Sequence, residues 1–300
     1  MPSPRNRPAF VLAVACVLAG FSAQAADAPA LYKEHCAECH GADRFGGTGP
    51  ALLPENLGRL RPQAAAKVIA EGRPASQMGG FADRLDQDAL AALAQYIFSP
   101  IPVPQWGAAE IAASRIVHTA AADLSAKPVH AADPLNLFTV VEIGDHHVTI
   151  LDGDRFEPLW RFPSRFALHG GAKYSPDGRF VYLASRDGWV GKYDLHGLKP
   201  VAETRVAINT RNIAVSGHGR YIAAGNGLPP TIVILDAADL SVKKIIPVAG
   251  DGGKTSRVSA VYDATPRNSF IVALRDIPEL WEISYLDNPP PVPRGLIHNY

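Results

Sequence analysis

The stretch Gly178-Arg179-Phe180-Val181-Tyr182 decides the fold of the larger part of this chain, because it recurs 41 residues later as Gly219-Arg220-Tyr221-Ile222-Ala223. Three similar runs, TILD, GKYD and VILD, end at Asp152, Asp194 and Asp236, and consecutive runs lie 42 residues apart. A period just above forty residues, with four short strands in each unit, is typical of a β-propeller. A β-sandwich would not keep this period, so we expect a propeller segment.

Short β-branched or aromatic runs, bounded by Gly, Pro, Asp and Asn, predict strands throughout residues 135–300. The predicted strands are Leu137–Ile143, Val148–Leu151, Phe180–Ala184, Trp189–Tyr193, Tyr221–Ala224, Ile232–Leu235, Phe270–Leu274 and Leu280–Ser284. These 166 positions are enough for about four blades. A four-bladed ring needs a closing strand, and half of a larger ring would leave two exposed sheet edges, which soluble proteins avoid. Because no closing strand signal follows, we expect this sequence to be the N-terminal part of a longer protein.

A second motif, Cys36-Ala37-Glu38-Cys39-His40, predicts a different, helical part nearer the N-terminus. Two thiols one helical turn apart can add to the two vinyl groups of a porphyrin, and the next residue then supplies an axial imidazole. A redox dithiol would need a βαβ context, and half a zinc site would need a second Cys/His pair. The sequence has neither, so we expect one covalent heme c, with His40 as an iron ligand.

The sixth iron ligand is predicted to be Met78, which lies in a Gly/Pro-rich loop of residues 71–81. A core-filling methionine is the alternative, but a glycine-rich loop is a poor place for one. Pro50 is expected to accept a hydrogen bond from the ring of His40 and so fix its tautomer. Helices are predicted over 28–36 and over 87–98, the second capped by Asp86. This pattern is typical of a small all-α class I cytochrome c domain.

The first 25 residues carry the features of a secretory signal peptide. Arg5 and Arg7 precede an apolar run over 10–22, and Ala23-Gln24-Ala25 offers small residues for cleavage. The run is too short to span a bilayer comfortably. Cys16 would be lost with it, although a lipoprotein reading of Cys16 stays open. We therefore expect export to the periplasm and no membrane span after cleavage.

These signals divide the chain into a signal peptide (1–25), a cytochrome c domain (26–104), a proline-punctuated linker (105–134) and a partial propeller (135–300). The formal net charge is zero, so the sequence lacks the electrostatic footprint of a nucleic-acid-binding protein. We expect a redox protein of two domains.

A c-type cytochrome followed by a propeller resembles the cytochrome cd-one family, whose members carry heme d-one in an eight-bladed propeller. Residues 136–154 resemble the first blade of that family, and residues 227–230 resemble a further loop. The run 166–180 is similar to the segment that carries the proximal iron ligand, and the resemblance implies that His169 binds iron. It also implies the roles of three further residues: Arg186 and Arg211 would bind the carboxylates of the cofactor, and His298 would lie in the distal pocket.

Departures from the nitrite reductases of this family favour another activity. Two positions that are arginine there are matched by Ile143 and approximately by Ala172, and only ten residues separate the predicted cleavage site from Cys36. The sequence looks more like the dihydro-heme d-one dehydrogenases of denitrifiers, which oxidise a propionate of the precursor to an acrylate. That resemblance implies heme d-one or its dihydro form as a second, non-covalent tetrapyrrole. In this reading, His298 is the catalytic base.

Two other functions stay open. One is nitrite reduction to nitric oxide, and the other is a non-catalytic electron-transfer or heme-carrier protein whose propeller docks partners. The implied partners are a tetrapyrrole substrate, a small redox protein that accepts electrons, and nitrite reductase as the recipient of the finished cofactor.

Overall fold

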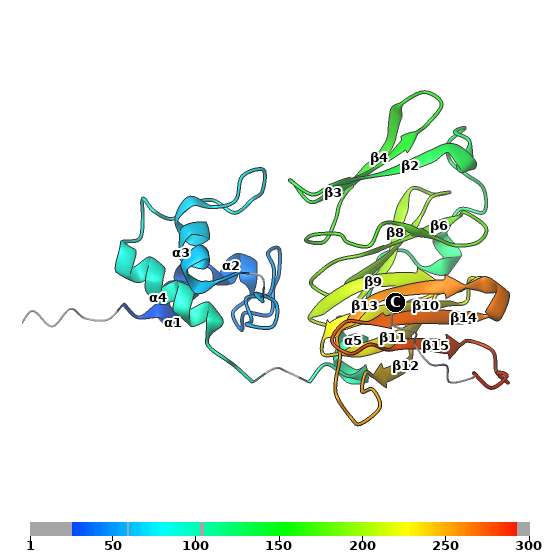
Figure 1. Ribbon diagram of the computed structural model, residues 1–300. Coiled ribbons are helices and arrows are strands. Elements are labelled where there is room, and N and C mark those ends of the chain that lie inside the picture. Colours follow the sequence, from blue (N-terminus) through cyan, green and yellow to red (C-terminus); the bar gives the residue numbers. More distant parts are fainter. Residues whose placement is uncertain (1–25, 59, 103–104, 293–300) are drawn as a thin grey trace, which may run out of the picture.

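The structure is a computed structural model that describes residues 26–58, 60–102 and 105–292 (Figure 1). The predicted signal peptide and His298 lie outside these residues. A helical part and a strand-rich part stand side by side. The described residues include no helix long and apolar enough to cross a membrane.

The helical part is a small bundle of four helices. Its helices are α1 (Ala28–His35), α2 (Ala37–His40), α3 (Pro62–Glu71) and α4 (Gln87–Phe98). Both predicted helices are present, and the side chain of Asp86 caps α4 by accepting a hydrogen bond of 2.8 Å from the backbone N–H of Ala89. Tyr32, Leu93 and Ile97 lie in the buried core that holds α1, α3 and α4 together.

The strand-rich part consists of four antiparallel sheets that follow one another along the chain. The first sheet holds β2 (Leu137–Glu142), β3 (His147–Asp152) and β4 (Glu157–Pro163). The second holds β1 (Ile116–Val117), β5 (Lys173–Tyr174), β6 (Phe180–Ala184), β7 (Trp189–Asp194) and β8 (Lys199–Arg205). The third holds β9 (Asn209–Val215), β10 (Tyr221–Leu228), β11 (Thr231–Asp236) and β12 (Val242–Pro247). The fourth holds β13 (Val258–Ala264), β14 (Ser269–Leu274) and β15 (Leu280–Ser284).

Each pair of consecutive sheets encloses its own apolar core, as the blades of a propeller do. Val148 and Leu183 belong to the core between the first and second sheets. Val190 and Val233 belong to the next core, and Ile232 and Val272 to the last. The 42-residue spacing places Asp152, Asp194 and Asp236 at the ends of the equivalent strands β3, β7 and β11. The predicted fold class, a cytochrome c domain followed by a propeller segment of about four blades, is therefore confirmed.

The segment 105–134, predicted from sequence to be a linker, takes part in the fold of the propeller. It forms α5 (Ala108–Ser114) and β1, and β1 pairs with β8 as an extra strand of the second sheet. Trp106 fixes its start, since the indole N–H donates to the backbone oxygen of Arg205 over 2.9 Å. A strand of two residues has no periodicity to detect, which is why sequence alone does not identify it. Three short 3-10 turns complete the elements: Ala121–Asp123, Pro134–Asn136 and Thr265–Arg267.

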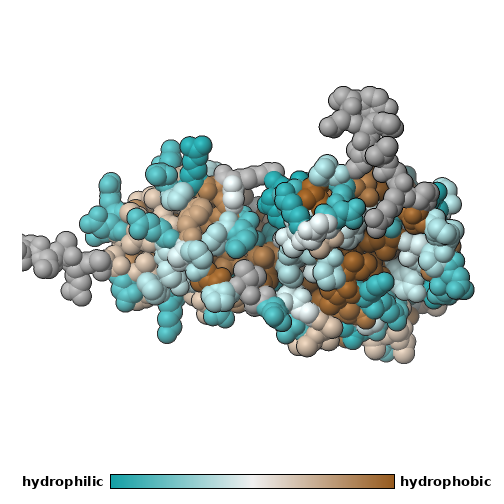
Figure 2. Space-filling view, turned by 60° about the horizontal axis from the view of Figure 1, so that its bottom comes forward, coloured by the Kyte–Doolittle hydropathy of each residue, from teal (hydrophilic) through white to brown (hydrophobic). Residues whose placement is uncertain are grey.

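The first and last sheets leave apolar side chains exposed. On β2, Phe138 and Val140 are exposed, and so are Tyr262 of β13 and Leu280 of β15. Figure 2 shows hydrophobic residues gathered on the surface of the strand-rich part, whereas hydrophilic residues predominate over much of the helical part. In a continuous ring of blades, faces such as these pack against a neighbouring sheet.

Candidate functional site

The cytochrome motif forms a preorganised imidazole ligand. His40 ends α2 and is buried, and its Nδ1–H donates to the backbone oxygen of Pro50 over 2.8 Å, as the sequence predicted. That bond places the ring proton on Nδ1 and leaves the lone pair of Nε2 for a metal. Burial also lowers the pKa of His40, which favours the neutral, ligating form.

The two thiols suit covalent attachment of a porphyrin. Cys36 lies at the junction of α1 and α2, and Cys39 lies one helical turn further on and is exposed. Burial, together with the nearby Cys39, raises the pKa of the Cys36 thiol to about 11. Two free thiols beside a neutral imidazole of fixed tautomer fit a covalent heme c.

Met78 lies in a tight loop between α3 and α4. The backbone N–H of Arg73 donates to the backbone oxygen of Met78 over 2.9 Å, which closes the loop. Ser76 braces it from within, because its hydroxyl donates to the backbone oxygen of Arg73 over 2.9 Å. The Met78 side chain is half-buried and does not belong to the apolar core of this part. The geometry of this loop is compatible with Met78 as the sixth iron ligand, and that role stays a prediction.

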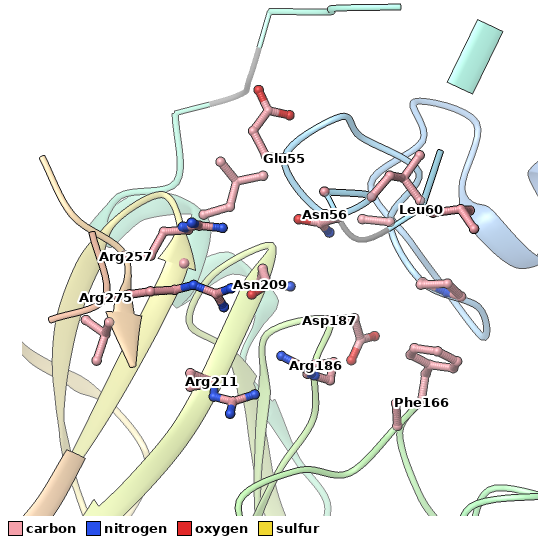
Figure 3. A pocket seen from close by; sticks show the side chains of 18 of the residues that line it. Glu55, Asn56, Leu60, Phe166, Arg186, Asp187, Asn209, Arg211, Arg257 and Arg275 are labelled. Atoms are coloured by element: carbon pink, nitrogen blue, oxygen red, sulfur yellow. The ribbon is translucent and has the colours of Figure 1, made fainter. Parts of the chain in front are cut away.

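A cavity of about 760 Å³ lies between the helical part and the strand-rich part (Figure 3). Residues 50–51, 55–58, 60 and 73 border it from the cytochrome side, and residues of the second, third and fourth sheets and their loops border it from the other. Five arginines line it: Arg73, Arg186, Arg211, Arg257 and Arg275. Glu55 and Asp187 are the acidic residues in the lining. Such an excess of guanidinium groups is suited to a ligand with several carboxylates.

Arg186 and Arg211 both line this cavity, and their role in binding carboxylates stays a prediction. Arg186 occupies the second position of the turn Ser185-Arg186-Asp187-Gly188, in which the Ser185 hydroxyl donates to the Asp187 carboxylate. Gly188 has φ +96°, and a Cβ there would lie 1.7 Å from the backbone oxygen of Ala207. Only glycine fits this turn, which directs the arginine toward the cavity.

His169 is held by the residue that covers it. Its Nδ1–H donates to the backbone oxygen of Arg211 over 2.7 Å, and the guanidinium of Arg211 donates to Nε2 over 3.1 Å. Burial lowers the pKa of His169, and the positive charges of Arg186 and Arg211 lower it further. The imidazole is therefore neutral, with its lone pair on the nitrogen that an iron would need. Arg211, which contacts that nitrogen, lines the cavity, and His169 does not.

Sequence reasoning missed three of the five arginines. Arg257 forms a two-pronged ion pair with Asp276, with N–O distances of 2.9 and 2.6 Å, and this pairing lowers the pKa of Asp276 to about 2. The backbone N–H of Arg275 donates to the backbone oxygen of Arg257 over 2.9 Å, which keeps the two arginines adjacent. Arg73 comes from the cytochrome side. No local motif marks them, because the fold brings together loops far apart in sequence.

The remaining predicted positions differ in what the structure says of them. His298 lies outside the described residues. Ile143 is exposed in the turn between β2 and β3. Ala172 is half-buried, and the amine of the adjacent Lys173 donates to the backbone oxygen of Gly170 over 2.7 Å. Among the described residues, no group of three or more His, Cys, Asp or Glu side chains is arranged to hold a metal ion by itself.

Comparisons with known proteins agree with this division. Residues 132–297 match the family model for the cytochrome D1 heme domain. Residues 23–97 match the model for subunit III of cbb3-type cytochrome c oxidase, a c-type cytochrome family. The first match covers more than half of the chain.

Three relatives span both parts. Dihydro-heme d1 dehydrogenase of Pseudomonas aeruginosa is 58% identical over 93% of this chain and 57% of its own length. A solved structure of dihydro-heme d1 dehydrogenase NirN in complex with DHE is 59% identical over 88% of this chain and 57% of that one, with a TM-score of 0.81. Nitrite reductase of Stutzerimonas stutzeri is 27% identical over 85% of this chain and 48% of its own length. The chain thus spans about half the length of these relatives, and by its match over residues 132–297 it belongs to the cytochrome D1 heme domain family.

Proposed function

We propose that this chain binds dihydro-heme d1, the dihydro form of heme d-one, in the cavity between its two parts and takes part in oxidising it in heme d1 biosynthesis. The observation that carries the proposal is the cavity itself, which has five arginines, a neutral histidine behind one of them, and a heme c motif on its cytochrome side. The 58% identity to a dihydro-heme d1 dehydrogenase supports the choice of substrate.

The reaction converts a propionate side chain of the substrate to an acrylate. One hydrogen leaves each of the two methylene carbons, so the step releases two electrons and two protons as the C=C bond forms. When bound, heme c supplies a one-electron acceptor, which must be used twice in each turnover. A small redox protein would then collect the electrons, since no second acceptor is implied by the sequence.

The residues of this chain would hold and orient the substrate. Arg186 and Arg211 would bind its carboxylates, and His169 would ligate its iron through Nε2. Arg211 must leave His169 for both contacts to form. In the free protein the guanidinium of Arg211 therefore covers Nε2 of His169, and it would leave that nitrogen when it binds a carboxylate of the substrate. His298, which we propose as the base, lies outside the described residues.

The site of action would be the periplasm, where heme c is attached after export. The signal sequence expected over residues 1–25 supports this location. A recipient such as nitrite reductase would take the finished cofactor.

The test uses the chain matured with heme c and supplied with dihydro-heme d1 and an excess of an oxidised small c-type cytochrome, which accepts the two electrons of each turnover one at a time. We expect the absorption of the substrate to change to that of heme d1 while the added cytochrome becomes reduced. His169→Ala should abolish the change, and His118→Ala should not, because His118 is exposed and outside the cavity. Binding without oxidation would contradict the proposed dehydrogenase and favour a carrier. Nitrite consumption by the chain loaded with heme d1 would favour the reductase.

A further inference from the structure

The cavity takes one of its five arginines from the cytochrome part. Arg186, Arg211, Arg257 and Arg275 belong to loops of the strand-rich part, whereas Arg73 belongs to the loop between α3 and α4. Figure 3 shows the four labelled arginines on the strand side, with Glu55, Asn56 and Leu60 of the cytochrome part facing them across the cavity. A ligand with carboxylates on two of its edges would reach both sides.

The loop that carries Arg73 also carries Met78. The hydrogen bond from the Arg73 N–H to the Met78 backbone oxygen closes it, and the Ser76 hydroxyl ties its two ends together by donating to the Arg73 oxygen and accepting from the Met78 N–H over 3.3 Å. The backbone of Arg73 therefore cannot move far without moving that of Met78.

The same loop lies against the first sheet of the propeller. The side-chain amide of Gln77 donates to the backbone oxygen of Asp145 over 3.4 Å. A Cβ on Gly144 would lie 3.2 Å from the backbone oxygen of Ala75, so this turn approaches the loop closely. This hydrogen bond is long and therefore weak.

We infer that Arg73 is a substrate-binding residue, which takes a carboxylate of the tetrapyrrole from the cytochrome side. This inference rests on the proposed function for the class of ligand. A tetrapyrrole bound to Arg73 and to the arginines of the propeller fastens the two parts to each other. It also restrains the loop that carries Met78, so a ligand bound in the cavity stabilises the cytochrome part against unfolding.

The test uses coproporphyrin III, a metal-free porphyrin with four propionates, added to the chain matured with heme c. Its affinity is measured by fluorescence titration for the wild type, Arg73→Gln, Arg73→Lys and Arg84→Gln. Arg84 is the matched control, because it is an exposed arginine of the same part and lies outside the cavity lining. Its contacts stay within its own loop: a hydrogen bond of 3.4 Å to Gly80, an ion pair of 3.6 Å with Asp83 and stacking over the ring of Phe81. We expect Arg73→Gln to weaken binding about tenfold, since a charge-assisted hydrogen bond is lost. Arg73→Lys should restore part of it.

A second measurement separates a bound carboxylate from a merely structural role. Saturating porphyrin should raise the melting temperature of the cytochrome part, followed by heme c absorption, in the wild type and in Arg84→Gln. In Arg73→Gln that increase should be smaller at the same porphyrin concentration, while the melting temperature without porphyrin should equal that of the wild type.

If Arg73→Gln and Arg84→Gln bound coproporphyrin III with equal affinity, the inference would be overturned. It would also be overturned if the porphyrin raised the melting temperature, followed by heme c absorption, equally in the two variants. Failure of the wild type to bind the porphyrin would overturn it as well. Because this probe is not oxidised, dependence on Arg73 would uphold the inference even if dihydro-heme d1 were bound but not converted.

Discussion

At the scale of single residues, the orientation of His40 depends on the absence of a side chain at Gly49. A Cβ at that position would lie 2.9 Å from Cε1 and 3.0 Å from Nδ1 of the imidazole. Gly49→Ala should therefore push the ring away from Pro50, and overpacking of this kind costs about 1 to 3 kcal/mol. Denaturant unfolding followed by heme c absorption measures the change.

Gly58→Ala is the matched control for this substitution. A Cβ at Gly58 would meet only the backbone oxygen of Glu55, at 4.0 Å, so we expect its unfolding free energy to equal that of the wild type. Equal stabilities of the two alanine variants would refute the steric role of Gly49.

A second prediction at this scale concerns His169. Because Arg211 donates to Nε2, the imidazole should react slowly with an acylating reagent such as diethyl pyrocarbonate. Loss of one charge-assisted hydrogen bond should accelerate modification of His169 about tenfold in Arg211→Leu. Quantitative mass spectrometry of the modified peptide gives the rate.

Arg186→Leu serves as the control, because it removes a charge from the same cavity but keeps the contact between Arg211 and His169. Acceleration of equal size in both variants would mean that the charge of the cavity, and not the hydrogen bond, protects the ring.

The residues of the two sites differ in how well they can be predicted from the sequence. His40 and Pro50 follow from short-range spacing, so the sequence alone predicts their hydrogen bond. The roles of His169, Arg186 and Arg211 follow from a family resemblance. Arg257 and Arg275 lie beside Arg211 only because the third and fourth sheets pack together, and no property of their immediate neighbours indicates this.

At the scale of elements, sequence identified the central strands and two outer ones, β2 and β15, and missed the other outer strands. β6, β7 and β11 are buried on both sides, and their β-branched and aromatic residues make them recognisable. The outer strand β12 includes two exposed lysines and gave no such signal. β9 was missed because polar residues fill its first half, where it approaches the cavity.

Within β7, the buried Lys192 has an unusual environment. Its amine donates to the backbone oxygens of Ala237 and Ala238, each over 2.9 Å, and lies 3.9 Å from the centre of the Phe180 ring. Burial lowers its pKa to about 8, and the charge of Arg179 contributes to the lowering, while Asp236 and Asp194 oppose the shift. The folded chain therefore loses this proton at a lower pH than the unfolded chain, in which a solvated lysine has its ordinary pKa of 10.5.

Between pH 8 and about 10.5 the unfolded state binds more protons at this position, so stability rises with pH across that window. We expect the wild type to gain up to about 3 kcal/mol relative to Lys192→Met as the pH rises through it. Urea unfolding at pH 7.5 and pH 10 gives the free energy of unfolding of both proteins. Subtracting the value of Lys192→Met from that of the wild type at each pH removes the contribution of the tyrosines, which titrate in both proteins. A difference that does not change with pH would show that Lys192 keeps an ordinary pKa.

At the scale of the whole molecule, a small apolar core and one half-buried arginine join the cytochrome part to the propeller, in addition to the contact of Gln77 with Asp145. Ala51 and Leu53 of the cytochrome part pack with Ile208 and Leu228 of the strand-rich part. Beside them, Arg205 donates to the backbone oxygens of both Asp187 and Phe45. Sequence predicted the two parts but not this contact, because Arg205 and Phe45 lie 160 residues apart and no motif links them.

Arg205 should therefore decide whether the two parts unfold together. Removing it leaves the backbone oxygens of Asp187 and of the half-buried Phe45 without this donor. A group that stays buried and unsatisfied costs roughly 1 to 3 kcal/mol. We expect a single calorimetric transition for the wild type matured with heme c and two transitions for Arg205→Met, with heme c absorption changing in only one of them. Arg155→Met, at an exposed position in the turn after β3, should keep the single transition. If Arg205→Met also unfolds in one step, the apolar core around Leu53 and Ile208 is sufficient to couple the parts, and the arginine serves only to order the turn of Asp187.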